Sequence, residues 1–501
     1  MRAGGCAWPR ELGTTPSAPT GSLGPAHSDG KSLISVVDVF AGPGGLNEGF
    51  SQVGRDSGAP TFSVVASFEK DPTAVATLKL RSAVRAVGID NPAYRRLLEG
   101  GALQDLRSDP AMAVALAQAS AEVHEIELGE SHRAEVRRRI SRSLNGAQDW
   151  VLIGGPPCQA YSLVGRSRRA HDETFAADEK HFLYREYLDI IQDHKPAVFV
   201  MENVKGLLSA SHAGIQMFGL IRKDLEVGGE YEIRSLVVES ENPDPSDFII
   251  RAEDYGIPQR RHRVILLGVR QDFADRVGTP LAPTGPVTVR SAIGDMSPVV
   301  AHMSRSVDDL RSPADARLAG VTYASEWLAN RRKLSDARVS PDKDAADRLR
   351  RWLRVGDVPI TLHEPRRHMA LDLARYVFLE ELAREGYAPK VDELPAGLAP
   401  DHKNVSGNQT PFRDRFKVQE WDRPSSTVAS HISKDGHYYI HPDPAQMRSL
   451  TVREAARLQT FPDDYFFCGT RTMQYHQVGN AVPPLLAYQI AKKVANILGV
   501  G

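Results

Sequence analysis

Hydrophobic positions in the first half of the chain fall into short continuous runs, separated by turns and by stretches with helical spacing. Apolar runs of roughly four to eight residues indicate buried strands, whereas apolar residues three or four apart indicate amphipathic helices. We expect strands at SVVDVF (35–40), TFSVVASFEK (61–70), DWVLIGG (149–155), AVFVMENV (197–204), YEIRSLVVE (231–239) and HRVILLGVR (262–270). Helices are expected at LNEGFSQV (46–53), DPTAVATLKLR (71–81), HFLYREYLDIIQ (181–192) and 212–227.

Strands that alternate with helices predict an α/β fold, with a mostly parallel sheet covered by helices on both faces. A charged, helical insertion over about 83–147 interrupts this alternation. After residue 271 the alternation stops, and residues 271–420 are rich in Pro, Arg and Asp with only scattered helical periods. We therefore expect a main domain over 33–270 and a smaller, irregular second domain over 271–420.

The two ends of the chain differ in order. Residues 1–32 are rich in Gly, Pro, Ser, Thr and Ala without periodicity, which predicts a disordered tail. Order returns in 421–501, which we expect to complete the main domain. There Thr451 and Glu454 have the spacing of a helix capping box, and a last helix is expected at 484–497.

Composition narrows the class of protein. The 501 residues include 41% hydrophobic and 25% charged residues, as in ordinary globular proteins, and no apolar run approaches the length of a membrane helix. The three cysteines lie far apart, so neither a disulfide framework nor a CxxC zinc site is expected. The net charge of −1 excludes a uniformly basic nucleic-acid binder, although arginines cluster locally. The run RAEVRRRISR (133–142) is typical of a solvated helix face.

A glycine-rich turn follows the first predicted strand, in DVFAGPGGLNEGF. Such a turn lets the backbone approach a ligand closely. It is not the dinucleotide fingerprint, because Asn47 replaces the third glycine of G-x-G-x-x-G. Glu69 ends the next strand, where a carboxylate can accept hydrogen bonds from ribose hydroxyls. The pair would suit a nucleoside cofactor that lacks a pyrophosphate, although a tight turn without a ligand is also common.

The stretch GGPPCQAYS places Cys158 directly after the strand WVLIGG. This is the sheet edge where ligands of open α/β folds collect. Pro156 and Pro157 restrict the backbone, so the thiol is held in one place. A structural cysteine would more often lie inside an apolar run. The position therefore favours a nucleophile that reacts as a thiolate.

Two further groups are expected at the same edge. Glu202 ends the next strand, and a carboxyl in a site that excludes water can be protonated at neutral pH and donate a proton. A cap or a salt bridge is the simpler alternative for Glu202. Arg261 and Arg263 are two apart at the start of a strand, so we expect both side chains on one face. Two guanidinium groups there suit phosphates or the edge of a heterocycle, although a surface ion-pair cluster would give the same pattern.

The motifs FAGPGG, GGPPCQAYS, ENV, QRRHR, RPSSTV and QVGNAVPP, in this order, resemble those of the cytosine-C5 DNA methyltransferases. The resemblance covers about 34–270 and 420–498, and implies a Rossmann-like methyltransferase fold that uses S-adenosylmethionine. In this family the central region, here 271–420, is the target-recognition domain. The segment RPSSTV (423–428) resembles the one that positions that domain.

The resemblance also implies a mechanism. The Cys158 thiolate would attack C6 of a cytosine flipped out of duplex DNA, while Glu202 protonates N3, so that C5 becomes nucleophilic enough to be methylated. Arg263, and with it Arg261, would hold the base. The residues that match cofactor-binding positions of the family are Phe40, Ala41, Gly42, Gly44, Gly45, Leu46, Glu69 and Asn480. The residues on the segment that closes over DNA are Gln159, Ser162, Arg166 and Arg168. The family has a further acid after its third strand, and Asp105 is the candidate for it.

Three alternatives bear on this interpretation. Amino-group DNA methyltransferases have an aromatic residue where this chain has Cys158, which disfavours that class. A tRNA cytosine-C5 methyltransferase would keep every catalytic motif, but the long 271–420 region favours DNA. An inactive DNA-binding homologue is disfavoured because every catalytic residue type is present. No metal is expected. We expect a cytoplasmic, nucleoid-associated monomer without membrane contact, in a restriction-modification or related system. It would act with a cognate restriction endonuclease or a mismatch-repair nuclease.

Overall fold

The computed structural model describes residues 33–157, 183–212, 215–305, 310–329, 331–334, 339–400 and 413–501. The predicted tail over 1–32 lies outside these ranges. Within them, no helix combines the length and the apolar character that crossing a membrane requires.

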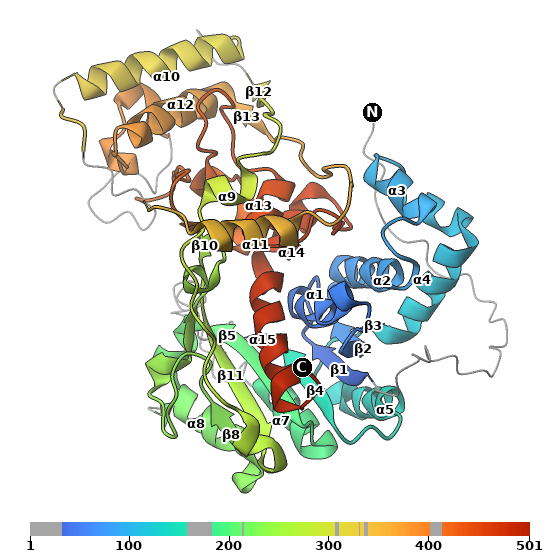
Figure 1. Cartoon of the computed structure of the whole chain (residues 1–501). Helices are drawn as coiled ribbons and strands as arrows, with labels where there is room; N and C mark the ends of the chain where they lie inside the picture. The colour runs from blue at the N-terminus through green and yellow to red at the C-terminus, as the bar shows by residue number, and fades with distance from the viewer. Residues whose placement is uncertain are drawn as a thin grey trace.

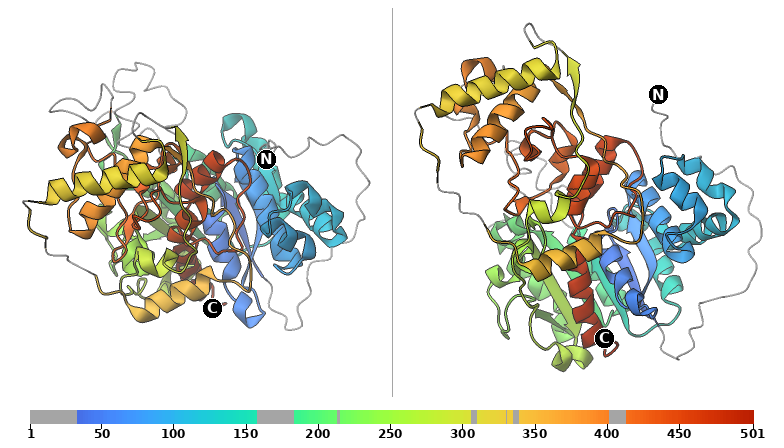
Figure 2. Two further views of the ribbon diagram at one scale, coloured as in Figure 1. Left: turned by 90° about the horizontal axis from the view of Figure 1, so that it is seen from above. Right: turned by 45° about the horizontal axis from the view of Figure 1, so that its top comes forward.

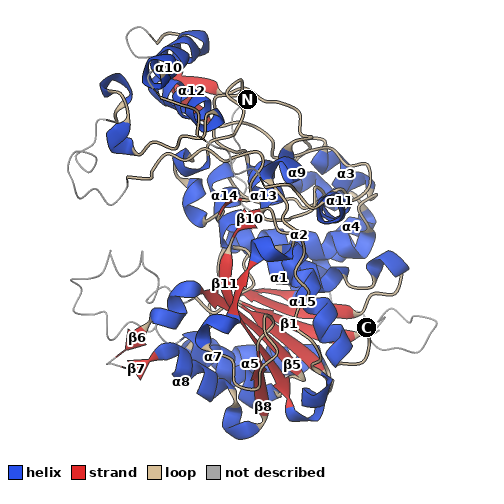
Figure 3. Cartoon of the chain, turned by 60° about the vertical axis from the view of Figure 1, so that its left-hand side comes forward, coloured by secondary structure: helices blue, strands red, loops and turns tan. Residues whose placement is uncertain are grey.

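An eight-stranded sheet lies in the lower half of the molecule as drawn in Figures 1 and 3. Its strands follow the order β3-β2-β1-β4-β5-β11-β8, and β9 pairs with β11. The strand bounds are β1 Ile34–Val39, β2 Phe62–Glu69, β3 Val123–Glu125, β4 Trp150–Gly154, β5 Val198–Val204, β8 Tyr231–Arg234, β9 Ile249–Arg251 and β11 His262–Arg270. The strands from β3 to β5 are parallel, whereas β11 is antiparallel to β5, β8 and β9. The predicted mostly parallel α/β sheet is confirmed.

Helices cover both faces of this sheet. Helices α5 (Arg133–Leu144), α7 (Leu183–His194) and α8 (Met217–Leu225) share one core with it. On the other face α1 (Gly45–Gln52) and the last helix α15 (Pro484–Ile497) form a second core, and Figure 1 shows α15 lying across the strands. The C-terminal segment therefore packs on the main sheet, and the helix predicted at 484–497 is confirmed.

The region expected to be a helical insertion also contains a strand. After α2 (Pro72–Val87) come α3 (Pro92–Leu98) and α4 (Pro110–Glu122), and then β3 pairs in parallel with β2. Because β3 has three residues and follows α4 directly, its sequence carries no period of its own. Asp105, the candidate for the acid after the third strand, lies instead on an exposed 3-10 helix before α4, so that assignment was wrong.

The run of arginines on α5 is an ion-paired surface, in agreement with the solvated helix face expected from the sequence. Arg133 binds Glu186 at 2.6 Å, and Arg139 binds Glu135 within the same helix. Arg137 binds Asp193 on α7. These pairs join α5 to α7 and leave little of the run available for phosphates.

The range 271–420 divides between two cores, which lie above the sheet in Figure 1. Helices α10 (Pro313–Leu328) and α12 (Ala370–Arg384) pack together at the far end of the molecule (Figure 2). Helices α9 (Val289–Ile293) and α11 (Lys343–Leu353) instead share a core with α13 (Val452–Leu458) and α14 (Arg471–Asn480). The capping box expected at Thr451 and Glu454 begins α13.

Candidate active site

The glycine-rich turn between β1 and α1 is held against the end of β2. Phe40 has a left-handed backbone, with φ of 54°, which side chains of its size rarely adopt. The backbone N–H of Gly42 donates a 2.8 Å hydrogen bond to Glu69 Oε2. Glu69 Oε1 accepts from the N–H groups of Lys70 and Asp71, each at 2.8 Å. The predicted Glu69 thus lies beside the predicted loop and fixes its shape, while Oε2, which accepts one hydrogen bond, retains capacity to accept from a ligand.

The C-terminal segment closes over this turn. A Cβ on Gly45 would lie 2.1 Å from the carbonyl oxygen of Val482, so only glycine allows this approach. The Tyr465 hydroxyl donates to the carbonyl of Pro43. Asn480 ends α14 and is exposed, with its amide 3.2 Å from His476 Nδ1. Residues more than 400 positions apart are thereby brought to one place, and the cofactor role of Asn480, two residues before Val482, stays a prediction.

Two carboxyl groups that lie near the turn were not identified from the sequence. Asp38 on β1 is fully buried, and neither of its carboxyl oxygens has a well-formed hydrogen bond to the described residues. Burial, and then repulsion from Glu69, raise the pKa of Asp38 well above its ordinary value. Glu125 ends β3 directly opposite Glu69 and is exposed. Its signal in the sequence, an acid at the end of a third strand, was hidden because β3 is so short.

Glu202 and Arg263 form an ion pair beside the segment that leads to Cys158. Arg263 lies on β11 opposite Val204 of β5, and its Nε is 2.8 Å from Glu202 Oε1. The two side chains are 18% and 15% exposed, so the pair is shielded from water yet open to a ligand. A Cβ on Gly155 would lie 2.9 Å from Glu202 Oε2, which places this carboxylate against the segment that leads to Cys158.

Asn203 anchors that segment. Its side-chain amide is buried and donates a 3.1 Å hydrogen bond to the carbonyl of Pro156. The ENV motif therefore holds Pro156 with the Asn203 side chain and presents the Glu202 carboxylate beside Gly155. Cys158 and the expected DNA-contacting residues lie outside the described residues, namely Gln159, Ser162, Arg166 and Arg168.

Arg261 departs from the expected arrangement. It lies between β10 (Gln259–Arg260) and β11 rather than within a strand, so it does not share a strand face with Arg263. Its buried guanidinium donates to the carbonyls of Val428, at 2.8 Å, and Gly479, at 3.3 Å. Burial, and then repulsion from Arg263, lower the pKa of Arg261 well below its ordinary value. In this geometry Arg261 joins the strand to the C-terminal segment, whereas Arg263 faces Glu202.

The RPSSTV segment (423–428) pairs with the short strand that directly precedes Arg261. Ser425 and Ser426 form β14 and pair in parallel with Gln259 and Arg260 of β10. The Gln259 amide, fully buried, also binds the carbonyl of Leu458 and the backbone N–H of Val428. The segment predicted to position the recognition region is thus bonded directly to the strand that leads to Arg263.

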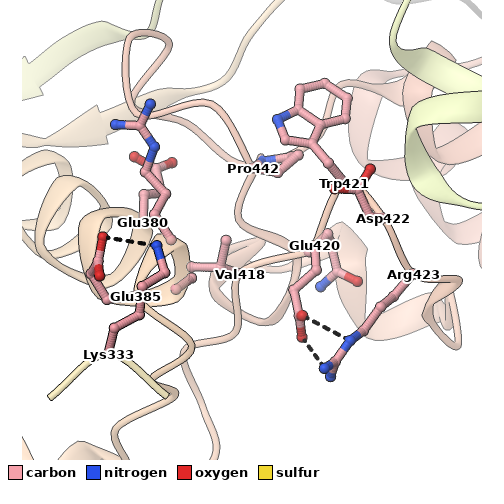
Figure 4. Close-up of a pocket in the computed structure, with 12 residues that line it drawn as sticks. Lys333, Glu380, Glu385, Val418, Glu420, Trp421, Asp422, Arg423 and Pro442 are labelled. Atoms are coloured by element: carbon pink, nitrogen blue, oxygen red, sulfur yellow. Dashed lines mark hydrogen bonds and ion pairs between the residues drawn. The ribbon is translucent and has the colours of Figure 1, made fainter. Parts of the chain in front are cut away.

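A separate cleft of about 330 Å³ lies between α12 and residues 418–423 (Figure 4). Two ion pairs lie along it, Lys333 with Glu385 at 3.4 Å and Glu420 with Arg423 at 3.1 Å. None of the predicted catalytic or cofactor-binding residues lines this cleft. It marks the junction of α12 with residues 418–423 and is separate from the glycine turn and the Glu202–Arg263 pair.

Comparison with known proteins agrees with this geometry. The model of the family described as C-5 cytosine-specific DNA methylase matches residues 102–496. The chain belongs to the C-5 cytosine-specific DNA methylase family. A type II methyltransferase of Bacillus paralicheniformis, M.Bpa9945I, is 34% identical over 489 residues, covering 92% of this chain and 99% of the relative. M.AgeI of Thalassovita gelatinovora, another type II methyltransferase, is 26% identical over 92% of this chain and 99% of its own.

A solved structure supports the fold of this methylase. A prophage-encoded E. coli protein, assigned as a DNA modification methyltransferase, superimposes with a TM-score of 0.50 at 21% identity, over 93% of this chain and 99% of its own. The methylase is therefore a DNA (cytosine-5-)-methyltransferase with homologues among type II restriction-modification enzymes.

Proposed function

We propose that this methylase transfers a methyl group from S-adenosylmethionine to C5 of a cytosine within one short sequence of double-stranded DNA. The observation that carries the proposal is the placement of the Glu202–Arg263 pair against the Gly155–Pro157 segment, at the sheet edge that also holds the glycine turn. A nucleophile at Cys158 would follow that segment directly.

The residues around the glycine turn fit the cofactor. Gly42 leaves the backbone open to a ligand, since a Cβ there would meet no heavy atom within 4 Å, and Glu69 can accept from the ribose hydroxyls of the cofactor. Glu125 lies on the neighbouring strand and would contribute to the same site. The buried, unsatisfied Asp38 is suited to a cofactor with a positive charge, because a nearby cation favours its ionised form. S-adenosylmethionine is such a cation, and it would supply the methyl group that C5 acquires.

The other half of the site would activate the cytosine. The Cys158 thiolate forms a bond to C6, and N3 takes a proton from Glu202, so that the electrons of the C5–C6 bond become available at C5. After C5 has gained the methyl group, a base removes the C5 proton, the C6–S bond breaks, and N3 loses its proton. Arg263 would hold Glu202 in position and donate hydrogen bonds to the cytosine carbonyl.

Reaching C6 requires the cytosine to leave the duplex. Flipping a base out of the helix costs a few kcal/mol, which contacts on the segment after Cys158 would offset, with Gln159, Ser162, Arg166 and Arg168 as the proposed contacts. We propose that the 271–420 region reads the sequence, and that a nuclease with the same recognition site acts alongside the methylase, in keeping with its type II relatives.

Covalent trapping tests this mechanism. DNA with 5-fluorocytosine at the target position can form the C6–S bond and accept the methyl group, but C5 then has no proton to release. We expect a protein–DNA adduct that survives denaturing electrophoresis in the presence of S-adenosylmethionine. Its mass should place the linkage at Cys158, and the Cys158→Ala variant should form none. An adduct at another residue, or none with DNA that the enzyme methylates, would refute the covalent step.

A further inference from the structure

A strip of exposed and half-buried cationic and aromatic side chains lies beside the β10–β14 pair, and the motifs assign it no role. We name it the β10–β14 patch, and it consists of Arg260, Lys417, His431, Lys434 and Tyr438. Arg260 is exposed although its neighbours Gln259 and Arg261 are buried, because alternate side chains of an extended segment point to opposite sides. The Thr427 hydroxyl donates to the Arg260 carbonyl, which fixes this part of the catalytic domain to the C-terminal segment.

The remaining members come from the C-terminal segment and contact one another. The Lys417 ammonium lies 5.3 Å from the centre of the Tyr438 ring, and the His431 ring lies 5.7 Å from Tyr438. Lys434 follows His431 by three residues, and both are exposed. Burial, and then repulsion from Arg260, lower the pKa of Lys417. Gln419, two residues after Lys417, accepts a 2.8 Å hydrogen bond from the N–H of Ser426, which pairs with Arg260 in the β10–β14 ladder, so the two cations lie in the same region.

Several other basic groups of the chain form ion pairs, and the patch differs from them in this respect. On α5, Arg133 and Arg137 are paired with acids of α7, and Arg270 is paired with Asp149 and Asp272. Within the described ranges, no ion pair joins Arg260, Lys417 or Lys434 to an acid of the chain.

The carboxylates near the patch leave a positive balance. Glu420 is paired with Arg423, and Asp435 with Arg415, both at 3.1 Å. Asp414 is the remaining carboxylate that acts on Lys417, and it offsets one charge. Uncompensated cations that water can reach on one surface are the electrostatic signature of a polyanionic partner.

The position of the patch indicates which polyanion it would bind. Arg260 precedes Arg263 by three residues, so their Cα atoms are at most about 11 Å apart. Arg263 opposes Val204 at the carboxyl end of β5, the edge where the target cytosine would react. A duplex placed there has phosphates every few ångströms along each strand, within reach of side chains of this length.

We propose that the β10–β14 patch binds the DNA backbone next to the target cytosine, with Arg260, Lys417 and Lys434 as phosphate contacts. Tyr438 and His431 would pack against the sugar chain between them. The inference rests on the proposed function, since it takes duplex DNA as the substrate. Phosphate contacts fix the register of the protein on DNA but carry no sequence information. The patch would thus hold the duplex over the active site while other residues read its bases.

Salt dependence of DNA binding tests this inference in the full-length chain. Each phosphate contact contributes about 0.9 to the slope of log Kd against log salt concentration. We expect Arg260→Ala, Lys417→Ala and Lys434→Ala each to lower that slope by about 0.9, and the triple variant by about 2.7. If the difference in DNA affinity between a variant and the parent chain vanishes near 1 M salt, each single variant binds DNA roughly eightfold more weakly than the parent at 0.1 M salt. The loss should be equal for duplexes with and without the methylated sequence.

The control is Arg138→Ala on α5, which also removes an exposed cation but lies on the helix layer of the sheet, away from β10 (Figure 1). It should leave the slope unchanged. Lys417→Arg and Lys434→Arg should restore it, which a folding defect would not. Slopes of the alanine variants equal to that of Arg138→Ala would overturn the inference and assign the patch to a different acidic partner. Methylation by the parent chain is measured separately, so failure of the proposed function would appear there instead.

Discussion

Substituting Gly45 by alanine tests whether the glycine turn and the C-terminal segment form one cofactor site. The added Cβ would lie 2.1 Å from the carbonyl oxygen of Val482 and 3.1 Å from its carbon and nitrogen. Because ordinary contacts begin at about 3.5 Å, the two backbones must separate by more than about 1 Å. Neither is a flexible side chain that could turn aside.

The expected effect has two parts. Overpacking of this kind destabilises a fold by about 1–3 kcal/mol. The displaced segment also carries Asn480, two residues before Val482, and a shift of about 1 Å in a site can lower activity by roughly 100-fold. We expect Gly45→Ala to remain folded, to bind S-adenosylmethionine at least tenfold more weakly by calorimetry, and to lose methyl transfer in proportion.

The matched control is Gly219→Ala on α8. No heavy atom lies within 4 Å of the added Cβ, and alanine favours a helix over glycine by up to about 1 kcal/mol. This variant should bind the cofactor normally and unfold no more easily than the parent. If Gly45→Ala bound and reacted like Gly219→Ala, the close contact between the turn and Val482 would not shape the cofactor site.

The remaining predictions concern catalysis, a buried charge and pH. Glu202→Gln should lower the single-turnover methylation rate by roughly 10²–10⁴-fold, since the proton donor is lost, and a loss below tenfold would count against that role. Glu48→Gln should lower the free energy of unfolding in urea by about 3 kcal/mol, because the buried Arg81 loses a charged partner at 2.6 Å. The control is Glu127→Gln, which removes an exposed partner of Lys70 and should lower that free energy by less than about 1 kcal/mol. Burial lowers the pKa of His368 to about 3 and of His441 to about 4, and histidine in an unfolded chain titrates near 6.5. The unfolded state therefore takes up protons first, so Tm should be constant above about pH 6.5 and fall toward pH 4, less steeply in His368→Gln.

Local sequence patterns predicted much of the fold. The first strand and its turn, the capping box at Thr451, and the helix at 484–497 each depend on neighbouring residues, and the structure has all of them. The expected strand at 231–239 is limited to Tyr231–Arg234. Strand direction is set by pairing between distant segments, so the sequence pattern could not show that β11 is antiparallel.

The site was predictable where a motif coincides with a strand end. Glu69 ends β2 and Glu202 lies two residues before the end of β5, and the structure places both at the expected edge. Arg261 was misplaced because spacing alone cannot reveal the break between β10 and β11, which turns its side chain toward the carbonyls of Val428 and Gly479. Asp38 was missed because a lone acid in an apolar strand gives no sign of its missing partner.

The most direct test of the account is bisulfite sequencing of DNA from a methylation-deficient bacterial host that expresses this chain. The parallel sample is the Cys158→Ala variant at the same level of soluble protein. We predict protected cytosines within one short sequence in the first sample and none in the second. Protection that persists without Cys158, or none with a folded parent chain, would contradict the proposed reaction.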